Sequence, residues 1–292
     1  MIHENVLRFR NARYLWWSLG LLALSVVLYF TQGDRQPPNG GTWQGYVLGS
    51  IGAALIVWLS LLGVRKRSYR STLGSVQGWV SAHVYLGLAL LVVATLHSAA
   101  QVNWNVHTLA YVLMCLVIFS GMYGAYVYLE NPRLQTRNRA GATREALFAE
   151  LFELDRQGLE IAEHCNPEVQ AVVKSAIQRT VIGGGVAQQL LGRDRSKMIG
   201  YDQGGATVDN ADQQPVIDLV GRIVPRAEKA SEAANLQALL TLLCRRQNIL
   251  RRLREDIRLQ GWLKVWLYMH VPLTVALLGA LSVHILTTFL YW

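Results

Sequence analysis

Five long apolar segments constrain this chain of 292 residues more than any other feature of its sequence. A helix needs about 20 mostly apolar residues to cross the hydrocarbon core of a bilayer, and each segment is close to that length. Only 16% of the residues are charged, whereas 52% are hydrophobic. The sequence therefore predicts an all-α fold, a polytopic membrane helix bundle with five transmembrane helices and a helical cytoplasmic insertion. The five segments run approximately over residues 14–31, 44–64, 77–98, 106–129 and 263–291.

A charged stretch between the fourth and fifth segments divides the chain into three parts. We expect spans one to four in residues 1–129, a helical cytoplasmic domain in 130–262, and span five in 263–292. Leucines recur with helical periodicity over 143–165 and over 216–260. Two stretches between these helices differ in predicted structure. Pro167 can open a helix to about Arg179, whereas residues 181–215, rich in Gly, Asp and Gln, are predicted as a loop.

Two further positions are expected to interrupt helices. Asn131–Pro132 should stop the fourth span, because the residue before a proline is disfavoured in the helical region. Gly261 should bend the chain where the last cytoplasmic helix runs into the fifth span. The leucine face of that helix consists of Leu236, Leu239, Leu240, Leu243, Leu250 and Leu253.

The basic residues predict the orientation of the spans. Cytoplasmic loops of membrane proteins carry an excess of Lys and Arg. The loops at 32–43 and 99–105 hold a single basic residue, Arg35, so the opposite loops should face the cytoplasm. We therefore expect a bacterial inner-membrane protein with its N-terminus and residues 130–262 in the cytoplasm and its C-terminus outside. This distribution also explains the net charge of +9 without any nucleic acid.

Four histidines form two pairs with identical spacing inside apolar segments. His83 and His97 are 14 residues apart, and so are His270 and His284. Fourteen residues make nearly whole helical turns, so each pair projects from one face, about 21 Å apart along the axis. Histidine inside a membrane span is costly and is usually functional. Spans three and five are parallel in this topology, which places His83 level with His270 and His97 level with His284.

Haem iron is the metal that this arrangement favours. Neutral imidazole is an axial haem ligand, and two axial imidazoles leave no open position for catalysis at the iron. We therefore predict two b-type haems, an inner one on His83 and His270 and an outer one on His97 and His284, and no catalytic residue. Zinc ligands would have to converge, which pairs about 21 Å apart cannot do. The three cysteines form no C-x-x-C motif for a c-type haem; Cys115 is expected to pack within the fourth span, and Cys165 and Cys244 are expected to be free thiols.

Several other residues are candidates to assist the haems. Haem propionates are anionic, so basic residues at the inner edge could contact them, and His107 could do so at the outer edge. Glycines let a helix or a flat cofactor approach the backbone closely. Pro272 should either kink span five or remove one backbone hydrogen bond there, and a kink would tilt His270 onto the inner haem. The inner basic candidates are Arg65, Lys66, Arg67, Arg70 and Lys264, and the glycines of span two are Gly45, Gly49 and Gly52.

The His-x13-His pairs on the third and fifth spans resemble the transmembrane haem module of ferric reductases and NADPH oxidases. The cytochrome b subunit of quinol–cytochrome c oxidoreductases follows a similar local plan. The resemblance covers spans three to five and implies that His83, His97, His270 and His284 are axial haem ligands. Ferric reductases continue into a flavin and nicotinamide domain. This sequence has no G-x-G-x-x-G motif after a strand, so we expect it to lack the flavin domain and to take no hydride itself.

Three functions follow from these expectations. The first is transmembrane electron transfer through two stacked bis-histidine haems, as a subunit of a membrane redox complex such as a respiratory complex. Its partner would be a cytoplasmic flavoprotein or iron–sulfur protein, or a periplasmic cytochrome c, and residues 130–262 would dock one of them. The second is a quinol-oxidising or quinone-reducing haem subunit, with a quinone as a further cofactor. The third is a non-redox membrane anchor or scaffold that holds no cofactor.

Overall fold

The computed structural model describes residues 6–32, 39–68, 72–139, 141–201 and 205–290, except for the side chains of residues 129, 131–133, 135–137 and 139. The described residues are mostly helical, which confirms the predicted all-α class. Among them, five helices are long and apolar enough to cross a membrane, so the chain has the character of a multi-pass membrane protein. These candidate spans are Val6–Phe30, Trp43–Arg67, Val76–Ser98, Val106–Tyr128 and a part of Ala230–Leu290.

The chain divides into two compact units. The membrane unit comprises Met1–Val127 and Trp266–Trp292, and the second unit comprises Tyr128–Val265; the sequence placed these divisions at 130 and 262. The membrane unit holds α1 (Phe9–Phe30), α2 (Trp43–Ser60), α3 (Leu62–Arg67), α4 (Val76–Ser98), most of α5 (Val106–Arg139) and the C-terminal part of α10 (Ala230–Leu290). The second unit holds α6 (Arg144–Ala162), α7 (Pro167–Gln178), α8 (Val186–Leu191), β1 (Lys197–Ile199), β2 (Thr207–Asp209), α9 (Gln214–Ile223) and the first part of α10.

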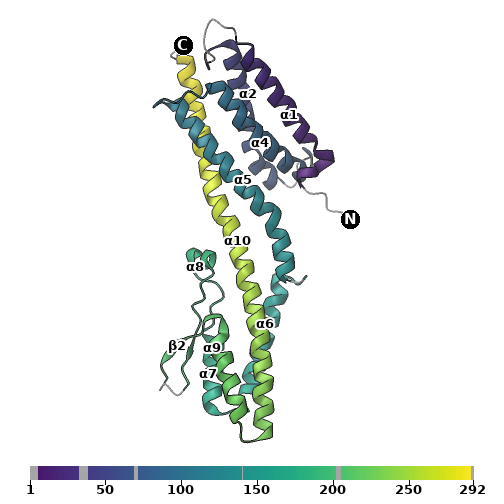
Figure 1. The fold of residues 1–292 in the computed structure, drawn as a ribbon, viewed down its shortest axis with the longest axis vertical. Helices are drawn as coiled ribbons and strands as arrows, with labels where there is room; N and C mark the ends of the chain where they lie inside the picture. Colours follow the sequence, from purple (N-terminus) through teal and green to yellow (C-terminus); the bar gives the residue numbers. More distant parts are fainter. Residues whose placement is uncertain (1–5, 33–38, 69–71, 140, 202–204, 291–292) are drawn as a thin grey trace. The chain divides into compact units, whose positions relative to one another are not determined.

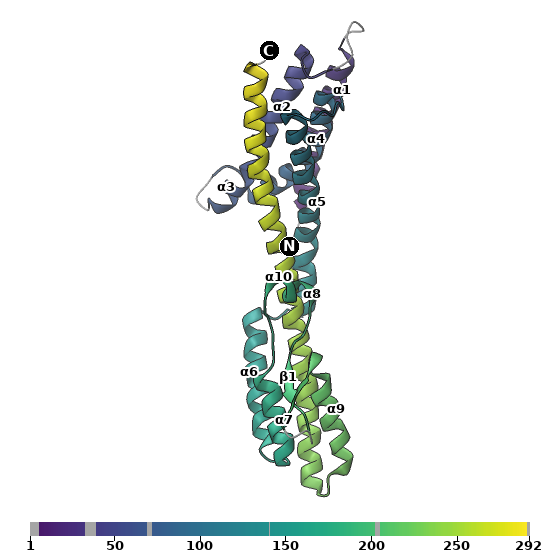
Figure 2. The ribbon, with the colours of Figure 1, turned by 90° about the vertical axis from the view of Figure 1, so that its left-hand side faces the viewer.

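Helix α4 is central to the membrane unit. Helices α1 and α2 both pack along it, and the C-terminal part of α10 runs beside α5 (Figures 1 and 2). Gly78 of α4 lies directly against the Phe9 ring, where an added Cβ would be 2.9 Å from the ring. The Tyr85 hydroxyl donates a hydrogen bond to the Leu7 carbonyl oxygen at 3.0 Å. Leu7 and Phe9 are thereby held against the first half of α4.

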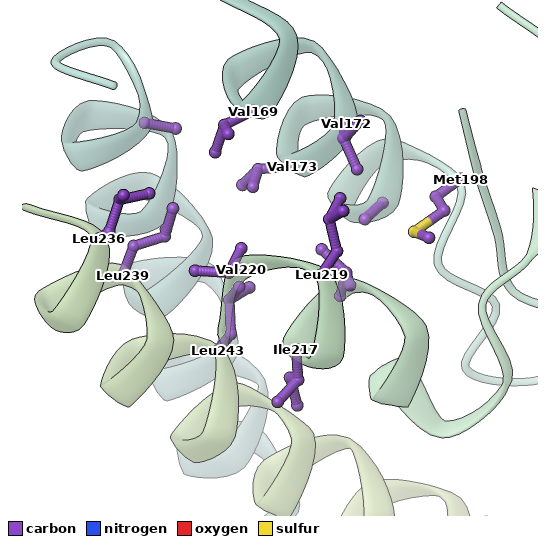
Figure 3. Close-up of a cluster of buried hydrophobic side chains, with 13 residues drawn as sticks. Val169, Val172, Val173, Met198, Ile217, Leu219, Val220, Leu236, Leu239 and Leu243 are labelled. Carbon is purple, nitrogen blue, oxygen red and sulfur yellow. The ribbon is translucent and has the colours of Figure 1, made fainter. Parts of the chain in front are cut away.

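The second unit has its own apolar core, in which α7, α9 and α10 meet (Figure 3). Leu236, Leu239 and Leu243 of α10 are at most 1% exposed and pack in the same cluster as Val173 and Val220. A second cluster joins Leu147, Leu151 and Leu154 of α6 to Leu250 and Leu253 of α10. These contacts bury the leucine face expected from the sequence, although Leu240 is only partly buried.

The helices are longer than predicted at two points. Helix α5 continues through Asn131–Pro132 to Arg139, so the predicted stop there is wrong. A proline inside a helix costs about 3 kcal/mol, which the remaining turns of a 34-residue helix can outweigh. Helix α10 likewise runs without interruption through Gly261 and Pro272. Gly261 is buried, and an added Cβ would lie 3.3 Å from Leu190, so this glycine serves close packing rather than a bend.

The region between α7 and α10 is more structured than predicted. Residues 181–215 contain α8 and an antiparallel pair, β1 and β2, in which Met198 lies opposite Val208. Asp194 organises this region, because its carboxylate accepts hydrogen bonds from the Ser196 amide and hydroxyl and from the Asp212 amide. The predicted helix over 216–260 is also two helices, since α9 ends before Pro225 and α10 begins at Ala230.

Candidate functional site

The four paired histidines lie in the membrane unit, two on α4 and two on α10, and all four are partly buried. The ring centroids of His97 and His284 are 6.1 Å apart, with the ring planes at 85°. His83 and His270 are close enough to interact electrostatically. The structure thus brings the His97 and His284 rings together and places His83 and His270 within electrostatic range, in the pairs that parallel spans predict.

The spacing within the outer pair suits a shared metal ion. An imidazole nitrogen lies about 2 Å from a bound metal. The ring centre lies about 1 Å beyond that nitrogen, so two imidazoles on opposite sides of one metal have ring centres about 6 Å apart. His97 and His284 have this separation. No group of three or more His, Cys, Asp or Glu side chains that could hold a metal ion occurs among the described residues. A haem needs only two protein ligands, because the macrocycle supplies the others.

Both histidines of α4 are held by backbone carbonyl groups of α2. His83 Nδ1 donates to the Leu59 carbonyl oxygen at 3.1 Å, and His97 Nδ1 donates to the Gly45 carbonyl oxygen at 2.8 Å. A carbonyl oxygen can only accept a hydrogen bond, so each neutral ring carries its proton on Nδ1. The lone pair of each ring is then on Nε2, which is the atom available for a metal.

Glycines of α2 make room for His97. An added Cβ on Gly49 would be 2.7 Å from His97 Cε1, closer than real Cβ contacts allow. Gly40 also lies against His97, with an added Cβ 3.3 Å from the same carbon. At Gly52 an added Cβ would meet only Leu90, at 3.8 Å. Of the three glycines of span two, Gly49 is therefore the one that lies against the His97 ring, while Gly45 lies against the carbonyl groups of Asn39 and Gly40.

Both histidines of α10 are held by side chains of α5. His270 Nδ1 lies 2.7 Å from Ser120 Oγ. His284 Nδ1 is hydrogen-bonded to His107 Nδ1, and the two rings are 4.5 Å apart. His107, which the sequence offered as a propionate contact, is thus a direct neighbour of a paired histidine. All four paired histidines use Nδ1 in these bonds, and no described residue forms a hydrogen bond to their Nε2 atoms.

The basic candidates lie in different surroundings. Arg67 is exposed at the end of α3, and Lys264 is exposed in the second unit. Arg70 lies outside the described residues. Arg65 closes the loop after α3, since its guanidinium donates to the carbonyl oxygens of Ser68 and Gly74. Lys66 is the basic residue of this set that is close enough to His83 for an electrostatic interaction.

An apolar layer lies between the two levels of histidines. Leu90 is seven residues from both His83 and His97, and Leu277 is seven residues from both His270 and His284. Both leucines are at most 3% exposed and belong to one cluster contributed by α2, α4, α5 and α10. This cluster places buried apolar side chains between the two pairs. Its buried members are Ile56, Leu59, Leu90, Met114, Ile118, Leu277 and Leu281.

Sequence reasoning identified the histidines but not the groups that hold them. The carbonyl oxygens of Leu59 and Gly45 carry no signal in the sequence, because every residue has such a group. Ser120 does carry one, since Ser120, Gly121 and Gly124 bring a hydroxyl and two small residues together in an apolar span. Cys165 and Cys244 are free thiols, as expected, and Cys115 is free as well.

The fold and the site together define a multi-pass helical membrane protein whose bundle holds two levels of facing histidines. No protein-family model, curated protein or solved structure matches this chain. Its function is therefore argued from the geometry of these residues.

Proposed function

We propose that this chain is a dihaem b-type cytochrome subunit that carries electrons across a membrane. The observation that supports this most directly is the common arrangement of the four histidines. Each uses Nδ1 to bond a neighbouring helix, and each is paired with a histidine of the other helix. Metal-bound histidines almost always have a partner at the second ring nitrogen, which fixes the orientation of the ring.

The ring separation of His97 and His284 fits a haem, and a second haem is assigned to the inner pair because its two histidines lie on the same two helices. His83 and His270 would hold one haem, and His97 and His284 the other. When bound, each haem supplies an iron that changes its charge by one electron. Gly87, one turn after His83, faces open space, since an added Cβ would meet nothing within 4 Å. The apolar cluster around Leu90 and Leu277 would exclude water between the haems and lower the local polarity, which is one determinant of haem potential.

The partners and the orientation belong to the same proposal. The basic loops favour a bacterial inner membrane, with the N-terminus and the second unit in the cytoplasm. The redox partner would be a flavoprotein or an iron–sulfur protein on that side, or a cytochrome c on the periplasmic side. The second unit offers a surface of its own for such a partner, because its core is complete without the membrane unit.

The test is haem stoichiometry in purified histidine variants. Wild-type protein should contain two b haems per chain by the pyridine haemochrome assay. H83A and H270A should each lose the same haem, and H97A and H284A should each lose the other, as judged by redox titration of the haem that remains. H164A, in the second unit, is the control and should keep both. A wild-type protein without haem, or H83A and H284A losing the same haem, would refute the proposal.

The same preparation separates the two alternatives. A quinone-reactive subunit requires that quinol analogues shift the titration of one haem, whereas a simple electron conduit does not. A scaffold or anchor requires that the wild-type chain contain no haem at all.

A further inference from the structure

We infer that Ser120 and Trp266 are positioning residues that fix the His270 ring and thereby set haem affinity and redox potential at the inner pair. The inference rests on the proposed haem site and goes one layer beyond the ligands. The two residues come from different helices, Ser120 from α5 and Trp266 from α10. Neither would touch the iron, since each acts through His270.

The hydroxyl of Ser120 determines where His270 carries its proton. Ser120 Oγ donates its single proton to the Val117 carbonyl oxygen at 2.9 Å. Its lone pairs therefore remain to accept a hydrogen bond from His270 Nδ1, 2.7 Å away. In this arrangement the neutral His270 ring is protonated on Nδ1 and presents the lone pair of Nε2. Ser120 thus provides through a side chain what Leu59 and Gly45 provide through the backbone for the α4 histidines.

Trp266 holds Ser120 and His270 together. It lies one turn before His270 on α10, and its indole Nε1 donates to the Ser120 carbonyl oxygen at 2.7 Å. Its ring also lies beside the His270 ring, with centroids 5.3 Å apart and planes inclined by 35°. A rotation of His270 would therefore have to displace either the serine hydroxyl or the indole ring.

The surface of α5 is shaped for this contact. An added Cβ on Gly124 would lie 2.0 Å from the Trp266 ring, so no larger residue leaves room for the indole. An added Cβ on Gly121 would lie 3.4 Å from His270 Cε1, which is ordinary contact. Helix α5 thus presents Ser120 and two glycines one turn apart. Trp266 and His270, which are also one turn apart on α10, pack against them.

Of the four proposed ligands, His270 is therefore the one that is oriented by a side chain which can only accept its hydrogen bond. The carbonyl partners of His83 and His97 cannot be removed by substitution, and the imidazole partner of His284 could donate or accept. Removing the Ser120 hydroxyl leaves His270 Nδ1 without an acceptor, which makes the ring a weaker donor to iron and frees it to rotate. Loss of such a partner typically weakens metal binding by about 10–100-fold.

The experiment compares four variants as purified full-length chains. S120A removes the acceptor, S120T restores a hydroxyl, and W266F keeps an aromatic ring without the N–H donor. S282A is the matched control, because Ser282 is a serine of α10 that donates to the Leu278 carbonyl oxygen. The measurements are haem affinity, the midpoint potential of each haem, and the low-temperature electron paramagnetic resonance spectrum, which reports the orientation of axial imidazoles.

S120A should bind the inner haem about 10–100-fold more weakly, raise its midpoint potential and shift only its resonance signal. W266F should change the same signal in the same direction, whereas S120T and S282A should match the wild type. Unchanged inner-haem signals in S120A or W266F would overturn the inference, and so would equal changes in S120A and S120T. These outcomes all presuppose two haems in the wild type. A wild type without haem would instead refute the proposed function.

Discussion

Gly49 shows how one missing side chain can determine where a histidine ring lies. The His97 ring occupies the space that a Cβ on Gly49 would need, and the carbonyl oxygen that holds His97 belongs to Gly45, one turn earlier on α2. The glycine and the carbonyl group therefore act together: one admits the ring and the other orients it. Three residues further on, Gly52 faces only Leu90 at ordinary contact distance.

These surroundings predict opposite outcomes for two similar substitutions. G49A should displace the His97 ring, because a Cβ 2.7 Å from Cε1 cannot be accommodated without movement. The outer haem should then bind about 10–100-fold more weakly, as when a ligand loses its orienting partner. G52A should bind both haems as the wild type does. Haem titration of the two purified variants checks this, and equal occupancy in G49A and G52A would contradict it.

At this scale, the sequence predicts how the four histidines are paired but not what holds them. Spacing along a helix is a property of the sequence, so His83, His97, His270 and His284 could be paired by position alone. Their partners at Nδ1 are neighbours in space. Of these partners, His107 was singled out for a different contact, and Ser120 was not singled out at all.

Helix α10 joins the elements of the second unit through two adjacent arginines with contrasting surroundings. The Arg246 side chain is 1% exposed and bonds to Asp155 of α6, to Gln213 at the start of α9, and to Thr180 after α7. The Arg245 side chain is 66% exposed and pairs with Glu150 of α6. One arginine therefore links four segments inside the unit, while its neighbour forms a surface ion pair.

Substituting each arginine by methionine separates these roles. R246M should destabilise the second unit by about 3 kcal/mol, because Asp155 and Gln213 lose their buried partner. R245M should cost less than about 1 kcal/mol, as exposed ion pairs usually do. Chemical unfolding of the full-length chain, followed by circular dichroism, measures both. A loss in R245M as large as that in R246M would show that the buried network is not what stabilises this unit.

The elements differ in how far the sequence predicts them. Helices with a sustained leucine period, α6 and the first part of α10, lie where the pattern places them. Helix α8, with six residues, and strands β1 and β2, with three each, are too short for any period to appear. They depend on Asp194, whose partners come from two parts of the region and from Arg254 of α10. The prediction that Pro132 would end a helix and Gly261 would bend one is wrong, because both residues lie within continuous helices.

For the molecule as a whole, the arrangement of the basic loops predicts which ends of the helices face the cytoplasm. In a background with Cys115, Cys165 and Cys244 replaced by serine, single cysteines would replace the exposed residues Gln101 and Glu153. A membrane-impermeant maleimide should label Q101C in spheroplasts and E153C only after the membrane is permeabilised. Labelling of E153C in intact spheroplasts would show that the orientation is the opposite of the one predicted.

The bounds of spans two, three and four could be predicted to within three residues from apolar length, whereas the first helix begins at Val6 rather than at residue 14 and the fifth span is a part of Ala230–Leu290. The grouping of helices could not be predicted. That the α4 histidines are backed by α2 and the α10 histidines by α5 depends on which helices are neighbours, and apolar length does not determine this. The division into two units follows the change in composition near residues 128 and 265.

The 14-residue spacing of the histidines has an electrical consequence. For a chain that conducts between the two pairs, an electron would travel roughly 21 Å along the helix axis, or about 0.7 of a hydrocarbon core about 30 Å thick. Moving a full charge across a membrane at 100 mV involves about 2.3 kcal/mol. Each passage would therefore involve roughly 1.6 kcal/mol of electrical work at that voltage. The ratio of reduced to oxidised haem at the inner pair would then respond to membrane voltage, even with the redox state of both partners held constant.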